Sequence, residues 1–130
     1  MTEITVNLDE IEIKTAKALV NHGAKKWIAD EVAKAVRVAE AEGNKICGLY
    51  YLESYCNQLK SGRVDGKVDP EVKKVSGSSV YVDAKLAFAQ PAFSRGLTLA
   101  VELARNNGIS LFSIGHSHTC TSMGYFTSQI

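Results

Sequence analysis

The stretch VYVDAKLAFAQPAFSRGLTLAVELARNNGISLFSI, residues 80–114, decides the fold class of this chain. Residues 80–83 and 109–114 are short apolar runs that are typical of strands, and we expect the second of these strands to be buried. Between them lies a predicted long helix, residues 90–107, which ends at Asn106-Asn107-Gly108. The apolar residues that we expect on its buried face are Phe93, Leu97, Ala100, Val101 and Ala104. Strand, long helix and strand in this order predict a βαβ unit and hence an α/β layer.

A further strand and a helical layer are predicted upstream of this unit. Residues 72–75 form another strand-like run, separated from residues 80–83 by the turn-forming Ser76-Gly77-Ser78. Earlier still, apolar residues repeat at helical spacing in three segments, which end at Gly23, at Gly43 and near Gly62. We therefore divide the chain into an amino-terminal helical region, residues 1–66, and the start of an α/β domain for cofactor and substrate, residues 67–130.

Composition and charge describe an ordinary globular protein. Hydrophobic residues make up 45% of the 130 residues, and the formal net charge is +1 without a basic stripe, so we expect no nucleic-acid partner. No run approaches the ~20 apolar residues of a membrane span, and residues 1–4 do not begin a signal peptide. The odd number of cysteines, three, favours reduced thiols. We expect a cytoplasmic protein without a membrane partner.

The last residues, 123–130, read as a helix that is only beginning. Such a helix would leave an apolar face without a partner. We therefore expect the natural polypeptide to be longer than this chain, and the α/β sheet domain to be incomplete here.

The most reactive residues lie in GHSHTCTS, residues 115–122, directly after the predicted strand 109–114. In open α/β sheets, ligands bind in loops beyond the carboxyl ends of strands, and an imidazole there can transfer protons near neutral pH. His116 and His118 are thus candidates for catalysis. In the alternative interpretation these residues cap the next helix and form only local hydrogen bonds.

A zinc site is a second interpretation of this loop. In an extended backbone His116, His118 and Cys120 would share one face and offer nitrogen and sulfur ligands. The His-Ser-His core also resembles that of zinc deubiquitinase-type metalloproteases, but no Asp follows Asp83 and no fourth ligand is evident. We rank a zinc-dependent hydrolase using His116 and His118 third among the candidate functions and predict no metal.

The second candidate loop is GNKICGLYYLESY, residues 43–55. A glycine-bounded loop that enters a helix can present backbone N–H groups to an anion, and Lys45 would add positive charge. Cys47 is a nucleophile only if its pKa is lowered, and it can equally be a small buried apolar residue. The tyrosines of this segment can pack between layers. Neither a G-x-G-x-x-G nor a P-loop motif occurs in the sequence.

Taken in order, these segments resemble the malate/L-lactate dehydrogenase family, which is unrelated to the Rossmann-type dehydrogenases and includes ureidoglycolate and sulfolactate dehydrogenases and cyclic imino acid reductases. The resemblance covers nearly the whole chain, and each element is weak alone but fairly specific in this order. The matching residues are Gly43, Gly48, Leu52, Tyr55, Leu59-Lys60-Ser61-Gly62, Val82-Asp83-Ala84, Asn107-Gly108-Ile109, Ser117 and Gly124-Tyr125-Phe126.

The departures from the family pattern fall on its functional residues. Ile46-Cys47-Gly48 stands where the family has Ser-His-Gly, and Tyr51 stands where it has an Arg that grips the substrate. The family's catalytic His falls on Thr119, with His118 one place earlier. A non-catalytic protein on the same scaffold is therefore a second interpretation.

The resemblance implies hydride transfer between NAD or NADP and a 2-oxo or 2-hydroxy acid, or a related imino acid, in a homodimer. Within that frame, His118 or His116 would move the proton beside Thr119. The substrate would contact Cys47, Tyr51, Tyr55 and Lys45. Cofactor contacts in the family come largely from sequence that follows the part matched here, so the resemblance assigns none to this chain.

Overall fold

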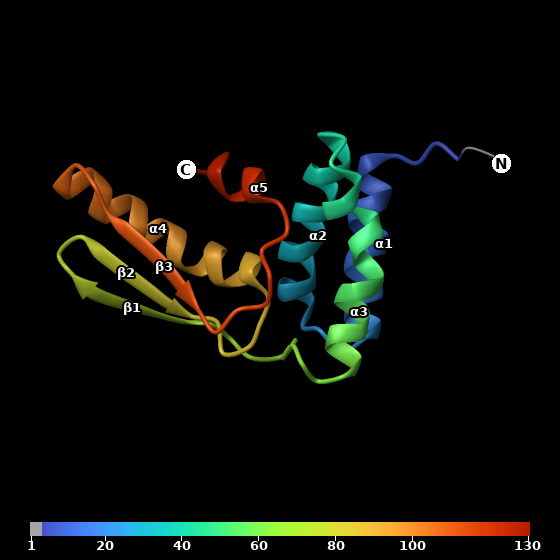
Figure 1. Cartoon of the computed structure of the whole chain (residues 1–130), viewed down its shortest axis with the longest axis horizontal. Helices are drawn as coiled ribbons and strands as arrows, with labels where there is room; N and C mark the ends of the chain where they lie inside the picture. The colour runs from blue at the N-terminus through green and yellow to red at the C-terminus, as the bar shows by residue number, and fades with distance from the viewer. Residues whose placement is uncertain (1–3) are drawn as a thin grey trace.

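The helical region and the sheet form two adjacent layers in the computed structural model, which describes residues 4–130 (Figure 1). Residues 1–3 lie outside the described residues, and the prediction that residues 1–4 do not begin a signal peptide falls partly on them. The helical layer contains α1 (Leu8–Asn21), α2 (Lys26–Ala41), the 3-10 turns η1 (Lys45–Cys47) and η2 (Leu49–Tyr51), and α3 (Leu52–Lys60). The second layer contains β1 (Glu71–Ser76), β2 (Ser79–Asp83), α4 (Ala89–Asn107), β3 (Leu111–Gly115) and α5 (Met123–Thr127).

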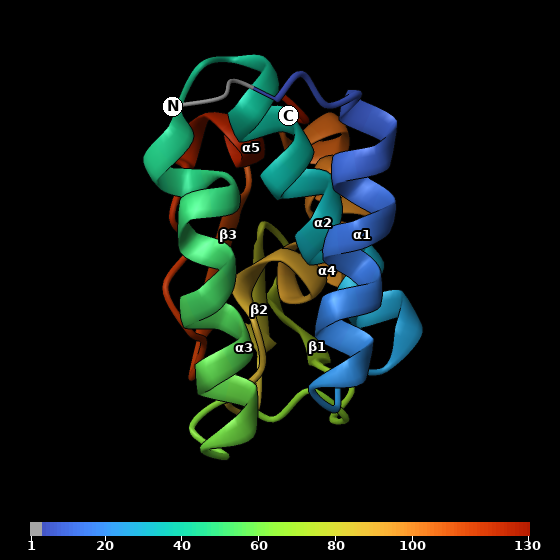
Figure 2. The same ribbon diagram turned by 90° about the vertical axis from the view of Figure 1, so that its right-hand side faces the viewer.

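The helical layer forms as the apolar spacing predicts. The side chain of Asn7 caps α1 by accepting a hydrogen bond from the N–H of Asp9 at 2.8 Å. Figure 2 shows α2 behind α1 and α3, on the side of the sheet. Because α2 contacts both α1 and α4, it buries a broad apolar face: Ile28, Ala29, Val32, Ala33, Ala35, Val36 and Ala39.

The sheet confirms the predicted βαβ unit. Its order is β1-β2-β3, with β1 antiparallel and β3 parallel to β2. Helix α4 connects the parallel strands and packs on the face that carries Val80 and Val82. The fold class is therefore α/β, as predicted, with a helical layer first and a small sheet after it. The division of the chain at residue 66 stays a prediction.

Strand β3 is not the buried strand that we expected. It is the edge of the three-stranded sheet, and α4 covers only one of its faces. Phe112 and Ile114 face α4, whereas Leu111 points away and is 65% exposed, and Ile109 precedes the strand and is 74% exposed. A continuous apolar run predicts burial on both faces, but only alternate residues find a partner here.

The buried face of α4 is also rotated from the predicted one. Phe93 and Ala100 are buried as expected, but Leu97, Val101 and Ala104 are only partly buried. Their places are taken by small residues that allow a close approach to the sheet, together with one leucine: Ala92, Gly96 and Leu103.

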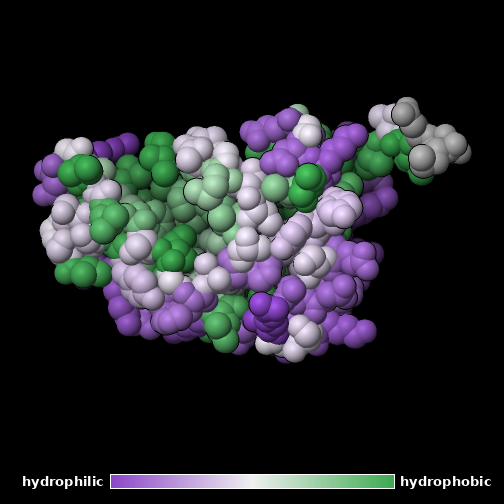
Figure 3. All heavy atoms as spheres, in the orientation of Figure 1, coloured by the Kyte–Doolittle hydropathy of each residue, from purple (hydrophilic) through white to green (hydrophobic). Residues whose placement is uncertain are grey.

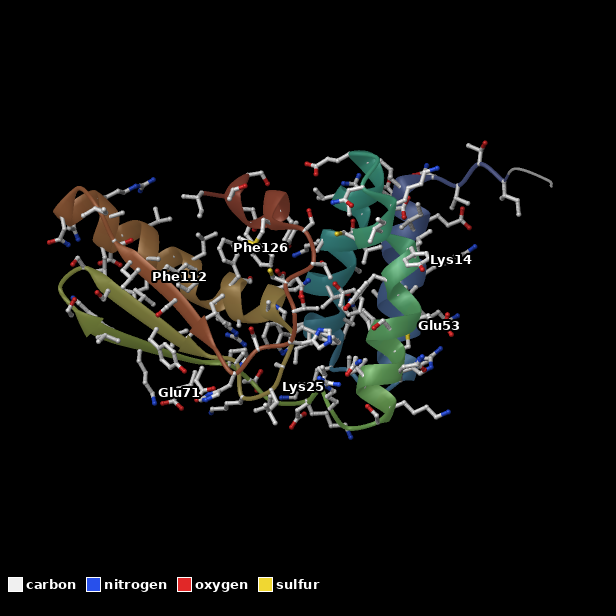
Figure 4. All side chains as sticks on the ribbon, viewed as in Figure 1. Lys14, Lys25, Glu53, Glu71, Phe112 and Phe126 are labelled. Atoms are coloured by element: carbon white, nitrogen blue, oxygen red, sulfur yellow. The ribbon has the colours of Figure 1, made fainter. Side chains whose placement is uncertain are left out.

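An apolar surface remains around β3 and α5, where Figure 3 shows hydrophobic side chains gathered. Phe112 and Phe126, both labelled in Figure 4, lie on this side of the molecule. Both pack against Phe93, with ring centroids 5.4 and 5.0 Å from that of Phe93. Met123 and Ile130 stay exposed at its border. Within residues 4–130, no helix has both the length and the apolar character needed to cross a membrane.

Gly96 is required by the contact between α4 and the sheet. A β-carbon at this position would lie 2.6 Å from atoms of both Val82 and Phe112. Gly96→Ala should therefore lower the free energy of unfolding of the natural polypeptide by about 1–3 kcal/mol, measured by denaturant titration. Gly77→Ala is the matched control, because nothing lies within 4 Å of that site. Equal stability of the two variants would contradict this packing.

Candidate active site

The loops that leave β2 and β3 meet at one edge of the sheet, because the two strands are parallel. Asp83 and Gly115 are paired residues at that edge. The following loops are tied together by two backbone hydrogen bonds, from the N–H of Leu86 to the carbonyl of His116 and from the N–H of His118 to the carbonyl of Ala87 (2.8 and 2.9 Å). Residues 116–122 then run between the two layers to α5 (Figure 1).

Backbone strain is concentrated at this edge. Lys85, Leu86, His116 and Thr121 all have positive φ, between 50° and 67°, although none is glycine. Such conformations cost free energy and cluster at functional sites. The left-handed conformation of His116 also breaks the strand geometry at this point. The backbone is therefore not extended here, as it would have to be for His116, His118 and Cys120 to share one face.

A cleft of about 460 Å³ lies between α3 and these loops. His118, Thr119 and Tyr51, three of the predicted site residues, lie on its wall. The complete lining is Tyr51, Gln58, Arg63, Leu86, Ser117, His118 and Thr119. The cleft thus combines one imidazole, one guanidinium and several neutral polar groups.

His118 is held against aromatic rings at the back of the cleft. Its ring centroid lies 6.1 Å from that of Tyr55 and 5.8 Å from that of Phe88, both in edge-on geometry. Its Nδ1 is buried and has no hydrogen-bond partner among the described residues. Burial, and secondly the positive charge of Arg63, lower the pKa of His118 from 6.5. The imidazole is therefore neutral at pH 7 and free to exchange a proton with a ligand.

Tyr55 lies behind the cleft rather than on its wall. The residue is 1% exposed, and its hydroxyl lies 3.1 Å from Oγ1 of Thr121 and accepts a hydrogen bond from Nε2 of Gln90 at 3.4 Å. Burial raises the pKa of Tyr55 to about 12. This hydroxyl is thus a neutral hydrogen-bonding group that joins α3, α4 and the loop after β3.

His116 does not line the cleft. Its Nδ1 lies 3.1 Å from Oδ1 of Asp83, and its side chain is largely exposed. A hydrogen bond from the N–H of Lys85, and then the contact with His116, lower the pKa of Asp83. The two predicted histidines therefore have different surroundings, and only His118 lines the cleft.

The loop before α3 binds an anion from its own chain. The carboxylate of Glu40 accepts a hydrogen bond from the N–H of Leu49 at 2.6 Å, and a β-carbon on Gly48 would overlap it. Lys45 is exposed and Cys47 half-buried in the turn η1, and neither lines the cleft. In the predicted anion cradle, Glu40 thus occupies the N–H group of Leu49, which is therefore not free to bind a phosphate.

Metal ligands do not converge at the site. Across residues 4–130, no group of at least three His, Cys, Asp or Glu side chains could hold a metal ion.

Three polar residues of this region escaped the sequence analysis. Arg63 and Gln58 line the cleft, and Gln90 is buried at the start of α4. Of the three, only Gln90 could have been recognised in the sequence, because it is a polar amide among apolar residues at the start of a helix. Arg63 and Gln58 looked like ordinary surface residues near the end of a short helix.

The chain is similar to known oxidoreductases over most of its length. It is 33% identical over 114 residues to a Delta(1)-pyrroline-2-carboxylate/Delta(1)-piperideine-2-carboxylate reductase from Pseudomonas syringae pv. tomato, covering 88% of this chain and 33% of that protein. It is 37% identical over 113 residues to a (2R)-3-sulfolactate dehydrogenase (NADP(+)) from Chromohalobacter salexigens, covering 87% and 34%. The chain thus spans about a third of the length of these curated relatives.

Solved structures show the same fold. The crystal structure of delta1-piperideine-2-carboxylate reductase from Pseudomonas syringae pv. tomato matches with a TM-score of 0.92 and 31% identity, over 95% of this chain and 37% of that one. Malate dehydrogenase from Pyrococcus horikoshii OT3 matches in fold, with a TM-score of 0.88 at 23% identity, over 97% and 36%. The family model described as malate/L-lactate dehydrogenase matches residues 6–130. The chain therefore belongs to the malate/L-lactate dehydrogenase family.

Proposed function

We propose that the natural polypeptide transfers a hydride between NAD(P)H and a 2-oxo acid or a cyclic imino acid. The observation that carries this proposal is the cleft, in which the partly buried His118 stands next to Arg63 in a chain of this family. The named relatives act on imino acids and on a hydroxy acid, and both substrate classes carry a carboxylate beside the reacting carbon. The volume of the cleft suits a small acid.

His118 would donate or accept the proton in this reaction. When hydride adds to the carbonyl or imine carbon, the electron pair of the C=O or C=N bond moves to the oxygen or nitrogen, which must then take up a proton. His118, once protonated, donates that proton, and in the reverse direction the neutral imidazole accepts it. Thr119, whose hydroxyl does not titrate near neutral pH, can hydrogen-bond the same atom but is a poor acid.

The described residues supply no glycine-rich loop for the phosphates of a dinucleotide. The N–H group of Leu49, in the loop before α3, is taken by Glu40, and the described helix starts carry no glycine-rich motif. The cofactor, NAD or NADP, is therefore proposed from the relatives, and its contacts are not assigned to this chain. A homodimer is proposed from the resemblance to the family, and a cytoplasmic location from the three cysteines, whose odd number favours reduced thiols.

We expect the natural polypeptide to bind NADH or NADPH with micromolar-range affinity, a free energy of about −8 kcal/mol. Calorimetric titration with each nucleotide measures this affinity, and a panel of 2-oxo and cyclic imino acids then identifies the substrate by nucleotide oxidation. Absence of binding to either nucleotide would favour the second candidate, a non-catalytic protein on this scaffold. A stoichiometric metal that supports hydrolysis would favour the zinc interpretation instead.

A further inference from the structure

We propose that Arg63 binds the carboxylate of the substrate and so holds the reacting carbon beside His118. This inference rests on the proposed function and names the residue that recognises the acid. Among the described residues that line the cleft, Arg63 is the single permanently charged side chain, and none of the others carries a carboxylate. This positive charge favours an anion as the ligand. The guanidinium offers paired N–H donors that match the two oxygens of a carboxylate.

Arg63 is free to take such a ligand. Two other arginines of the described chain are engaged, since Arg37 pairs with Asp9 at 3.0 Å and Arg95 lies 3.8 Å from Asp69. Arg63 forms no ion pair with any residue from 4 to 130. A bound carboxylate would give its charge a partner without breaking an existing contact.

The backbone around Arg63 is fixed although its side chain is exposed. Next to it, Val64 is 2% exposed and donates its N–H to the carbonyl of Gln58 at 3.2 Å. One residue further, the N–H of Asp65 donates to the carbonyl of Leu86 at 3.0 Å. These bonds join the end of α3 to the strained loop after β2, so the base of the side chain is held at the cleft.

Two unpartnered polar atoms support a polar ligand at this place. Oε1 of Gln58 and Nδ1 of His118 are both buried and lack hydrogen-bond partners within the described part of the chain, and both residues line the cleft. A buried polar atom without a partner carries a free-energy penalty that a polar ligand removes.

Arg63 and His118 are also coupled electrostatically. The positive charge of Arg63 disfavours protonation of His118, and a bound carboxylate would offset that charge. Substrate binding should therefore favour the protonated imidazole that reduction requires. The phenol of Tyr55 also faces His118, and because burial raises the pKa of Tyr55 to about 12, it is neutral at pH 7 and does not replace this coupling. The phenol of Tyr51 shares the cleft wall with His118.

The test is binding of matched ligands to the natural polypeptide, with and without NADP⁺ or NAD⁺. The probes are pyrrole-2-carboxylate and pyrrole-2-carboxamide, which differ in the charged group alone. Arg63→Gln should weaken binding of the carboxylate about 10- to 100-fold and leave that of the carboxamide nearly unchanged. Arg63→Lys should recover part of the loss. Arg105→Gln, at an exposed arginine of α4 outside the cleft, is the control and should change neither affinity.

The pH profile gives a second readout. In reduction assays, kcat/KM reports groups of the free enzyme, so its rise on acidification should follow the pKa of His118. Removing the nearby positive charge raises that pKa, so the profile of Arg63→Gln should shift to higher pH. A purely structural role of Arg63 would not shift it.

These measurements separate the inference from the proposed function. Loss of carboxylate selectivity in Arg63→Gln supports the inference even if no substrate is turned over. Turnover that is equal in wild type and Arg63→Gln, or unchanged carboxylate selectivity, would overturn the inference and leave the proposed function standing. Failure of the wild type to prefer the carboxylate over the carboxamide would also overturn it.

Discussion

His118→Ala in the natural polypeptide should lower turnover in the reduction of 2-oxo or cyclic imino acids by about 10²–10⁴, with little change in cofactor affinity. The loss follows from the position of His118 as the imidazole on the cleft wall. Without it, the oxygen or nitrogen that gains the electron pair must take its proton from water. Steady-state kinetics with the best substrate of the panel, together with cofactor titration, measure both quantities.

The competing assignment is tested by the same assay. His116→Ala removes an imidazole that pairs with Asp83 outside the cleft, so it should cost far less than His118→Ala. Thr119→Ala should weaken substrate positioning rather than proton transfer. His22→Ala, at the exposed end of α1, is the control for loss of a histidine. If wild-type turnover survives in His118→Ala, the assignment of the proton donor is wrong.

The direction of the pH dependence follows from the lowered pKa of His118. The donor must be protonated, and in the free protein it protonates only below its ordinary pKa of 6.5. The kcat/KM for reduction should therefore rise as the pH falls from 8 through 6. In His118→Ala this rise should disappear, because the titrating group is gone.

Phe88→Ala should lower the free energy of unfolding by about 3–5 kcal/mol, measured by denaturant titration. Phe88 is 0% exposed and belongs to the core of the helical layer, although it immediately precedes α4. Its ring lies 5.3 Å from that of Tyr55 and 5.8 Å from that of His118. Removing it leaves a cavity between the two layers and behind the cleft, so the orientation of His118 should also loosen.

Tyr50→Ala is the control for loss of an aromatic ring. Tyr50 is 80% exposed, and its removal should change the free energy of unfolding by less than about 0.5 kcal/mol. Phe88→Leu, which keeps most of the apolar volume, should fall between the two. A loss in Phe88→Ala as small as that in Tyr50→Ala would contradict the role of Phe88 as the connection between the layers.

The elements themselves could be predicted from local pattern. Helical spacing marked α1, α2 and α4, and the order of strand, helix and strand predicted the parallel pairing of β2 with β3. The resemblance of ordered segments predicted the family that the comparisons show. These features depend on residues close together in sequence, whose backbone geometry repeats with a fixed period.

The depth of burial could not be predicted in the same way. The sequence pattern predicted both Leu111 and Leu97 to be core residues. Leu111 instead lies on the uncovered face of the sheet, and Leu97 lies at the border of the buried face of α4. An apolar pattern states which faces prefer to be covered. Whether a partner covers them depends on how many layers surround the element and at which angle they pack.

For the candidate site, the sequence predicted the loop after β3, because an imidazole-rich segment beyond a strand end is a local feature. Only the tertiary structure separated His118 from His116, placed Glu40 in the anion cradle, and brought Arg63 to the cleft. The physical reason is that side chains from distant segments meet through the packing of whole layers. No periodicity in the sequence records the angle and depth at which those layers pack.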